Sequence, residues 1–285
     1  MYNPEYVLIL SGDHIYKMDY SKMLRAHIEN KADCTIAAIE VTLKEASRFG
    51  ILNTRDDDSI YEFEEKPKQP KSNLASMGVY IFTAEKMYKY LEEDDENPES
   101  SKDFGKNVLP AMLNAGERMF AYRFDGYWKD VGTISSLWEA NMDLLGENPA
   151  FDVSDTAWKI HSRNPLAPPE YQGEKAIVTN SMLALGSEIY GTVENSVLSS
   201  NVIVEEGAVV KDSVIMSGTV IKAGATVNYA IIDEDVVVEE GAVIGEDKSE
   251  AKGIAVLGRK VRIGKKARVT AGSIVDKNIE NGEEA

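Results

Sequence analysis

The sequence predicts an α/β domain followed by a parallel β-helix. In the first half of the chain, short apolar runs alternate with segments in which apolar residues recur every three or four positions. These are the patterns of buried strands and amphipathic helices. In the second half, aliphatic residues recur every six positions, a period that fits neither a helix nor an ordinary strand. A short fixed repeat is typical of stacked solenoid coils.

The first elements predict a strand, a helix and a second strand. Residues 6–10 form an unbroken apolar run, which is typical of a strand buried on both faces of a parallel sheet. Behind Asp19 as a possible N-cap, apolar residues spaced by three and four predict a helix that reaches Ile28. The second strand is expected at residues 34–41. This order indicates a βαβ unit.

The later part of this domain continues the alternation. We expect strands at residues 50–52, 60–63, 78–82 and 119–124, and helices at residues 84–91, 104–113 and 133–145. The α/β domain is therefore placed at residues 1–145. Residues 146–172 hold four of the nine prolines and little periodicity, so they are expected to be an extended linker.

Residues 173–285 are the expected β-helix domain. Its aliphatic positions are Val197, Ile203, Val209, Ile215, Ile221 and Val227, then Ile232, Val238 and Ile244 after a one-residue slip, and Leu257, Ile263, Val269 and Val275 after an insertion at residues 246–253. Glycines such as Gly207 and Gly224 suit the turns between faces. This hexapeptide pattern resembles that of left-handed parallel β-helices, a resemblance which implies that the aliphatic residue of each face points inward.

Composition narrows the classes of function. The chain has 48 acidic and 31 basic residues and a formal charge of -17, which disfavours binding to nucleic acid or to anionic membrane surfaces. No apolar run is long enough to cross a bilayer. The single cysteine, Cys34, rules out an intrachain disulfide and fits a reducing, cytoplasmic location.

Three residues are candidates for chemistry from their positions. Asp13 follows the first buried strand, at the kind of strand end where α/β sheets bind ligands. Lys66 precedes a proline, which is expected to hold its backbone extended as a phosphate clamp. Asp130 lies between a strand and a helix and would share a divalent cation with Asp13. The alternatives are that Asp13 caps the turn after it, that Asp130 caps the helix after it, and that Lys66 is a solvated surface lysine.

Five ordered motifs resemble those of the bacterial ADP-glucose pyrophosphorylases, also called glucose-1-phosphate adenylyltransferases. These motifs span residues 10–17, 47–50, 63–67, 74–78 and 126–133. The resemblance implies a Rossmann-like nucleotidyltransferase domain in which Asp13 and Asp130 hold Mg²⁺. It also implies that glucose 1-phosphate is bound by Gly50, Glu65, Lys66 and Ser76, with Asp13, Lys66 and Asp130 as the catalytic residues.

The implied reaction belongs to glycogen biosynthesis. An oxygen of glucose 1-phosphate attacks the α-phosphorus of ATP, which gives ADP-glucose and pyrophosphate. Such transfers depend more on positioning and charge stabilisation than on a proton-transfer residue. The resemblance further implies control by an allosteric metabolite and a homo-oligomer, a tetramer in the intact protein, or a hetero-oligomer with a related subunit.

One family feature is missing from the printed sequence. The resembling proteins open with a glycine-rich loop that wraps the nucleotide phosphates, and no such segment precedes Tyr6 or occurs later. We therefore expect an incomplete nucleotidyltransferase domain, short by on the order of 100 residues, with an exposed sheet edge and no turnover on its own.

Three other functions remain open. The chain would be a non-catalytic regulatory or scaffolding subunit if it only paired with a full-length partner through the β-helix. It would be a hexapeptide acyltransferase if a histidine acted on the coils, but His14, His27 and His161 all precede the repeat. A nucleotidyltransferase for a UDP-sugar or for GDP-mannose would differ mainly in the absent segment.

Overall fold

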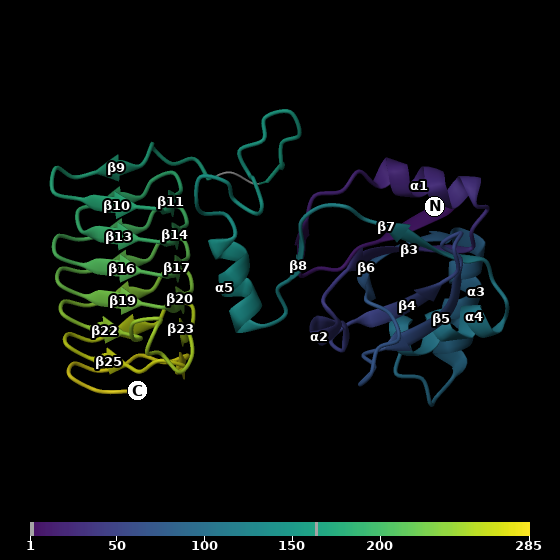
Figure 1. Cartoon of the computed structure of the whole chain (residues 1–285). Coiled ribbons are helices and arrows are strands. Elements are labelled where there is room, and N and C mark those ends of the chain that lie inside the picture. The colour runs from purple at the N-terminus through teal and green to yellow at the C-terminus, as the bar shows by residue number, and fades with distance from the viewer. Residues whose placement is uncertain (1–2, 163–164) are drawn as a thin grey trace. The chain divides into compact units, whose positions relative to one another are not determined.

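The computed structural model describes residues 3–162 and 165–285. It contains two compact units, residues 1–128 and 129–285, and each is described by itself (Figure 1). Residues 163 and 164 of the expected linker lie outside the described residues. The fold class predicted from the sequence, an α/β domain followed by a left-handed parallel β-helix, is confirmed.

The first unit is a six-stranded sheet with helices on both faces. The strand order is β5-β4-β6-β3-β7, and β1 pairs with β6 beside this path. The elements are β1 (Tyr6–Ile9), β2 (His14–Tyr16), α1 (Tyr20–Glu29), β3 (Cys34–Glu40), α2 (Leu43–Ala46), β4 (Gly50–Thr54), β5 (Ile60–Glu65), β6 (Leu74–Thr83), α3 (Ala84–Glu96), the π-helix η1 (Phe104–Val108), α4 (Leu109–Asn114) and β7 (Met119–Arg123). A further strand, β8 (Trp128–Asp130), begins at the end of this unit and pairs with β2.

The predicted βαβ unit needs a correction. Both β1 and β3 pair with β6 in the antiparallel sense, so β1 and β3 run parallel but have β6 between them. The expectation that β1 is buried on both faces is wrong, because its burial is intermediate and Leu8 is 38% exposed. The reason is that β6 is its only strand partner within the described residues, which leaves its other edge open.

Two apolar layers hold the helices on the sheet. Alternation along β3 sends Cys34, Ile36 and Ala38 into the cluster with α3, η1 and α4, whereas Ala37 joins the cluster with α1. The predicted N-cap of α1 is confirmed, because the Asp19 carboxylate accepts a hydrogen bond of 3.0 Å from the Ser21 amide. The sheet is therefore a rigid platform for the loops at its ends. No helix among the described residues has the length and apolarity that crossing a membrane requires.

The second unit contains α5 (Ile134–Met142) and a β-helix of short strands in three parallel sheets. The first sheet contains β10 (Ile177–Thr179), β13 (Thr192–Glu194), β16 (Val209–Lys211), β19 (Thr226–Asn228), β22 (Val243–Ile244) and β25 (Arg268–Val269). The second contains β11 (Met182–Leu183), β14 (Val197–Leu198), β17 (Val214–Ile215), β20 (Ala230–Ile232), β23 (Ala255–Leu257) and β26 (Ile274–Val275). The third contains β9 (Tyr171–Gln172), β12 (Glu188–Ile189), β15 (Ile203–Val204), β18 (Val220–Ile221), β21 (Val237–Val238) and β24 (Arg262–Ile263).

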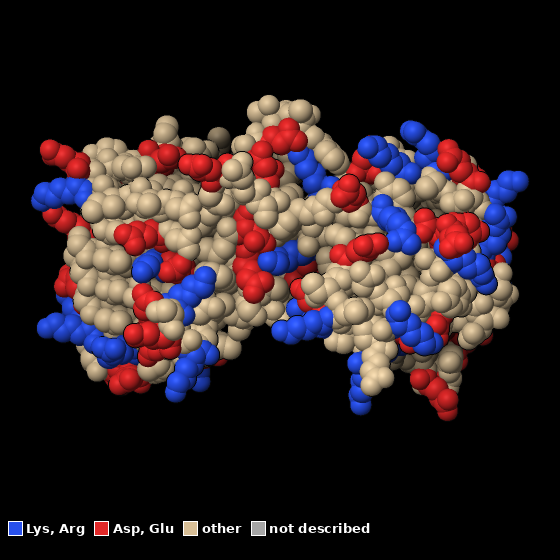
Figure 2. All heavy atoms as spheres, viewed as in Figure 1, with Lys and Arg blue, Asp and Glu red and all other residues tan. Residues whose placement is uncertain are grey.

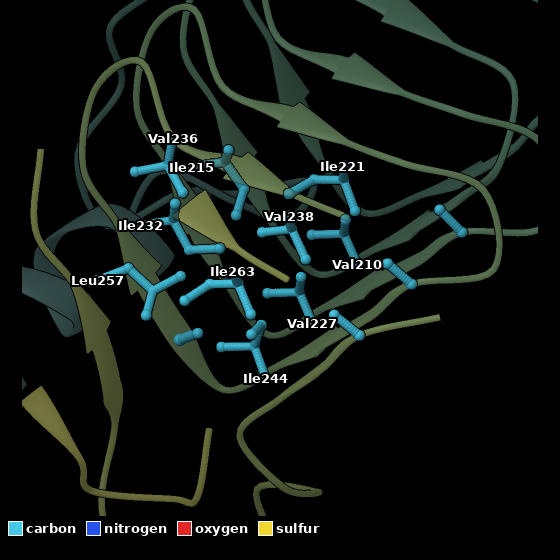
Figure 3. Packing of buried hydrophobic residues seen from close by; sticks show 14 of the residues in the cluster. Val210, Ile215, Ile221, Val227, Ile232, Val236, Val238, Ile244, Leu257 and Ile263 are labelled. Carbon is cyan, nitrogen blue, oxygen red and sulfur yellow. The ribbon is translucent and has the colours of Figure 1, made fainter. Parts of the chain in front are cut away.

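The inward positions of the β-helix differ from the prediction in its early coils. Residues from Ile215 onward point inward as expected and meet at the centre (Figure 3). At the three earlier positions the residue that points inward is the one after the predicted residue. These inward residues are Leu198, Val204 and Val210. Each predicted residue has an equally apolar neighbour there, so the pattern did not reveal which side chain faces in. Val197 pairs with Val214 and Val214 with Ile231, so these coils take 17 residues.

The helix α5 packs on the outside of the β-helix. The Trp138 indole N–H donates a hydrogen bond of 2.7 Å to the Asp212 carbonyl, and its ring contacts Tyr229 edge-on. The Lys248 amine, from the insertion at residues 246–253, lies 4.4 Å from the centre of the Trp138 ring. These contacts explain why the second compact unit begins before the expected boundary near residue 145. The division into functional domains stays a prediction.

Charged side chains of both signs are interspersed on the face shown in Figure 2. Several form exposed ion pairs, such as Lys175 with Glu206 at 2.8 Å and Lys265 with Glu240 at 2.9 Å. Exposed pairs of this kind contribute little to stability, because water screens their charges. The excess of acidic residues therefore affects the solubility and the association of the chain more than the stability of its fold.

Candidate functional site

Three predicted sugar-phosphate residues lie on neighbouring strands. Gly50 at the start of β4 pairs with Glu65 at the end of β5. On its other side β4 pairs with β6 through Ile51 and Ala75, so the next position along that antiparallel ladder brings Gly50 beside Ser76. The strand register thus brings Gly50, Glu65 and Ser76 together at one end of β4.

The Glu65 carboxylate is the half-buried acid of this cluster. Burial is the main cause of a raised pKa for Glu65, and the Asp103 carboxylate raises it further. The cations of Lys66 and Lys106 oppose this change, and the Lys66 amine lies 3.8 Å from the Glu65 carboxylate. A carboxylate held in partly dry surroundings is a strong acceptor for hydroxyl groups, such as those of a sugar.

Lys66 has a different backbone from the predicted one. Its φ is +47°, in the left-handed region, so the expectation of an extended backbone before Pro67 is wrong. The Lys66 amide donates a hydrogen bond of 3.1 Å to the Phe49 carbonyl and so turns the chain as β5 ends. This turn leaves the side chain of Lys66 largely exposed, with its amine free to approach an anion.

The loop between β1 and β2 ends at Asp13, and His14 begins β2 next to β6. The exposed Asp13 carboxylate accepts a hydrogen bond of 2.8 Å from the Ser11 hydroxyl. The Nδ1 atom of His14 lies 2.7 Å from the Met77 carbonyl, so it must carry the proton and donate it. The Trp128 indole nitrogen, 3.4 Å from the same atom, then makes an edge-on ring contact instead of a hydrogen bond to Nδ1. The Nε2 atom of His14 lies 3.6 Å from the Asp13 carboxylate.

Asp130 ends β8, the strand that pairs with β2. Its carboxylate accepts a hydrogen bond of 2.8 Å from the Gly132 amide, and the N-cap of α5 is Thr133, so Asp130 does not cap that helix. Asp13 and His14 belong to the first compact unit and Asp130 to the second, so a metal site that they share stays a prediction. Two carboxylates and an imidazole form a donor set that could hold a divalent metal ion.

Comparison with known proteins gives the family. Residues 1–147, more than half of the chain, match the family model described as nucleotidyl transferase. The chain belongs to the nucleotidyl transferase family. Residues 168–254 match a second model, described as the GlmU-like C-terminal hexapeptide, which agrees with the coils of the β-helix.

Several curated relatives of this nucleotidyl transferase are named glucose-1-phosphate adenylyltransferase. One from Clostridium botulinum (strain Alaska E43 / Type E3) is 60% identical over 209 residues, which cover 73% of this chain and 54% of the relative. One from Clostridium beijerinckii is 59% identical with the same coverage. One from Bacillus cereus (strain Q1) is 59% identical and covered to 56%. The chain therefore spans about half the length of these relatives.

Sequence reasoning missed two residues that lie beside the predicted site residues Glu65 and Ser76. The Tyr80 hydroxyl is hydrogen-bonded to Ser76, and burial raises the pKa of Tyr80 to about 12. Asp103 precedes η1, and its charge acts on both Glu65 and Tyr80. Tyr80 was detectable, because Ser76 and Tyr80 lie four positions apart on one strand and alternation puts them on the same face. Asp103 is distant in sequence from the recognised motifs.

A separate hollow on the β-helix contains none of the predicted site residues. It is lined by Gly173, Glu174, Lys175, Tyr190, Glu205, Glu206 and Ala223. The Lys175 amine and the Glu206 carboxylate form an ion pair of 2.8 Å there, and both side chains are highly exposed. These charges satisfy each other, so we assign the hollow no ligand.

Proposed function

We propose that the first unit binds glucose 1-phosphate as the sugar substrate of a glucose-1-phosphate adenylyltransferase. The observation that carries this proposal is the junction of Gly50, Glu65 and Ser76 at the end of β4. It is supported by the 60% identity to a protein named for that activity. The whole reaction, with ATP as the second substrate, is part of the proposal because the relatives are longer.

The residues of this site have different roles in the proposed binding of the substrate. The Glu65 carboxylate and the Ser76 hydroxyl suit the hydroxyl groups of the sugar, since a half-buried acceptor strengthens such hydrogen bonds. The exposed amine of Lys66 suits the phosphate, where it would reduce the negative charge of the attacking group. An oxygen of that phosphate attacks the α-phosphorus of ATP, the bond to the pyrophosphate group breaks, and pyrophosphate leaves with its electron pair.

Mg²⁺ is the divalent cation that we assign to this site. Asp13 and Asp130 would supply the carboxylate oxygens that Mg²⁺ prefers. When bound, such an ion neutralises charge on the phosphate oxygens.

Broader properties follow from the same assignment. We propose domain limits of residues 1–145, 146–172 and 173–285, an allosteric metabolite as regulator, and a cytoplasmic tetramer that acts in glycogen synthesis. The rival proposal is a scaffolding subunit that pairs through the β-helix. The retained cluster of Gly50, Glu65 and Ser76 favours the enzyme, because a scaffold needs no sugar site.

Calorimetric titration with glucose 1-phosphate tests the proposed substrate. We expect saturable binding that Lys66→Ala weakens roughly 10-fold, the value of a hydrogen bond to a charged group. Lys22→Ala is the matched control, because Lys22 is an exposed lysine on α1. Glucose 6-phosphate and inorganic phosphate serve as competing ligands. Equal affinity for all three, or equal effects of the two substitutions, would contradict a dedicated site and favour the scaffold.

A further inference from the structure

The Glu65 carboxylate lies against two glycines from different elements. A Cβ atom added to Gly50 on β4 would lie 3.1 Å from its Oε2 atom. A Cβ atom added to Gly105 on η1 would lie only 2.6 Å from the same oxygen and 3.2 Å from the carboxyl carbon. Real Cβ atoms essentially never approach an oxygen so closely. The carboxylate therefore occupies the space that a side chain at position 105 would need.

Backbone conformation does not explain the glycine at position 105. Gly105 is buried within the π-helix η1, and its φ lies outside the positive range that favours glycine. Ordinary L-residues adopt helical backbones without strain, so the local fold would accept alanine. The neighbour that would not accept it is Glu65, a residue 40 positions earlier that belongs to the proposed sugar site.

We infer that Gly105 is a positioning residue that sets the location of the Glu65 carboxylate for the sugar. This inference rests on the proposed function, because it assigns Glu65 the sugar hydroxyls. Gly105 itself contributes no group to the ligand. Its missing side chain lets the carboxylate settle against the π-helical backbone, at the point where β4, β5 and η1 meet.

The π-helix is anchored, so the carboxylate is the partner that would move. The Asp103 side chain accepts a hydrogen bond of 2.9 Å from the Lys106 amide and fixes the start of η1. The Phe104 ring stacks on Tyr80 of β6, with ring centres 5.7 Å apart and an interplanar angle of 28°. Wider turns of this type are found frequently at functional sites. A methyl group at position 105 would thus displace the flexible end of Glu65 and leave the helix in place.

The two glycines differ in what they touch. A Cβ atom at Gly50 would lie 2.4 Å from the Phe63 ring, which packs on the apolar cluster of the sheet. Gly50→Ala would therefore disturb packing as well as Glu65. Gly105→Ala meets the carboxyl group of Glu65 and, at 3.4 Å, an oxygen of Asp103, so it isolates the position of the carboxylate.

A double-mutant cycle on the full chain tests this inference. Glucose 1-phosphate affinity is measured by calorimetry for the wild type, Gly105→Ala, Glu65→Asp and the double variant. We expect Gly105→Ala to weaken binding roughly 10-fold, as for a misplaced hydrogen bond to a charged group. In the Glu65→Asp background, where the shorter acid has left the contested space, it should change affinity by less than about twofold. Gly258→Ala, whose nearest added contact is 3.4 Å, is the glycine control.

The outcomes separate the two proposals. The positioning role would be overturned if Gly105→Ala weakened binding equally in both backgrounds, or if it lowered the melting temperature enough for unfolding to explain the loss of affinity. Either result would leave the substrate assignment intact. Absence of wild-type binding would defeat the substrate assignment alone. In that case crystal structures of the wild type and Gly105→Ala decide the inference: a displaced Glu65 carboxylate supports it, and an unmoved carboxylate rejects it.

Discussion

His27 lies fully buried in the first unit, with both ring nitrogens in hydrogen bonds. The Thr83 hydroxyl donates to the Ala32 carbonyl at 2.9 Å, so it accepts the proton of His27 Nε2 at 3.2 Å. The Nδ1 atom then accepts from Thr35 at 2.8 Å, which makes the ring neutral. Burial lowers the pKa of His27 from 6.5 to about 4, against a smaller opposing effect of Asp33.

This buried ring predicts a loss of stability in mild acid. The folded pKa lies below the unfolded one, so the contribution of His27 is complete above pH 6.5 and falls as the pH drops towards 4. Between pH 7.5 and 5 the free energy of unfolding should fall by roughly 2 kcal/mol more in the wild type than in His27→Gln. Urea unfolding at the two pH values measures this difference. Parallel losses in both proteins would show that other groups control the acid response.

At the same scale, the sequence singled out candidate residues, whose roles stay predictions, but not all of their conformations. Asp13, Glu65 and Ser76 were found from motifs, whereas the left-handed turn at Lys66 was not, since it depends on the amide's hydrogen bond to Phe49. Tyr80 and Asp103 were missed because their roles arise from the approach of η1 to the sheet. Local patterns carry no information on such an approach.

Among the elements, the β-helix offers a direct test of its corrected register. Val209 and Val210 are adjacent and chemically identical, but Val210 is fully buried in the coil and Val209 is only partly buried. Val210→Ala should lower the free energy of unfolding by about 2 kcal/mol, through lost burial and a cavity. Val209→Ala should cost less than about 0.5 kcal/mol. Denaturant unfolding compares the pair, and a reversed order would restore the register that the sequence suggested.

Element types were predicted more reliably than their partners. Most strand and helix positions in the first unit followed from periodicity, including α1 with its Asp19 cap and the helical stretch that became η1 and α4. The short elements β2, α2 and β8 were not predicted. The pairing of β1 with β6 could not be predicted in this way, because the two strands are far apart in the sequence. A run of apolar residues does not distinguish a central strand from an edge strand with one open side.

For the whole molecule, the six-residue repeat made the β-helix the safest prediction. Each coil of the β-helix contacts only the coils next to it, so the repeat in the sequence corresponds directly to the repeat in the structure. The extent of the first domain was harder to predict, because α5 follows the nucleotidyl transferase pattern in sequence and packs on the β-helix in space.

The measurement that tests the central claim most directly is a crystal structure of the chain soaked with glucose 1-phosphate. The account predicts the sugar beside Gly50 and Ser76, with a hydroxyl hydrogen-bonded to the Glu65 carboxylate and the phosphate next to the Lys66 amine. A Glu65→Ala crystal soaked in parallel should lose the ordered sugar. Density for the ligand at another place, or unchanged in the variant, would contradict the assignment of this end of β4 as the sugar-phosphate site.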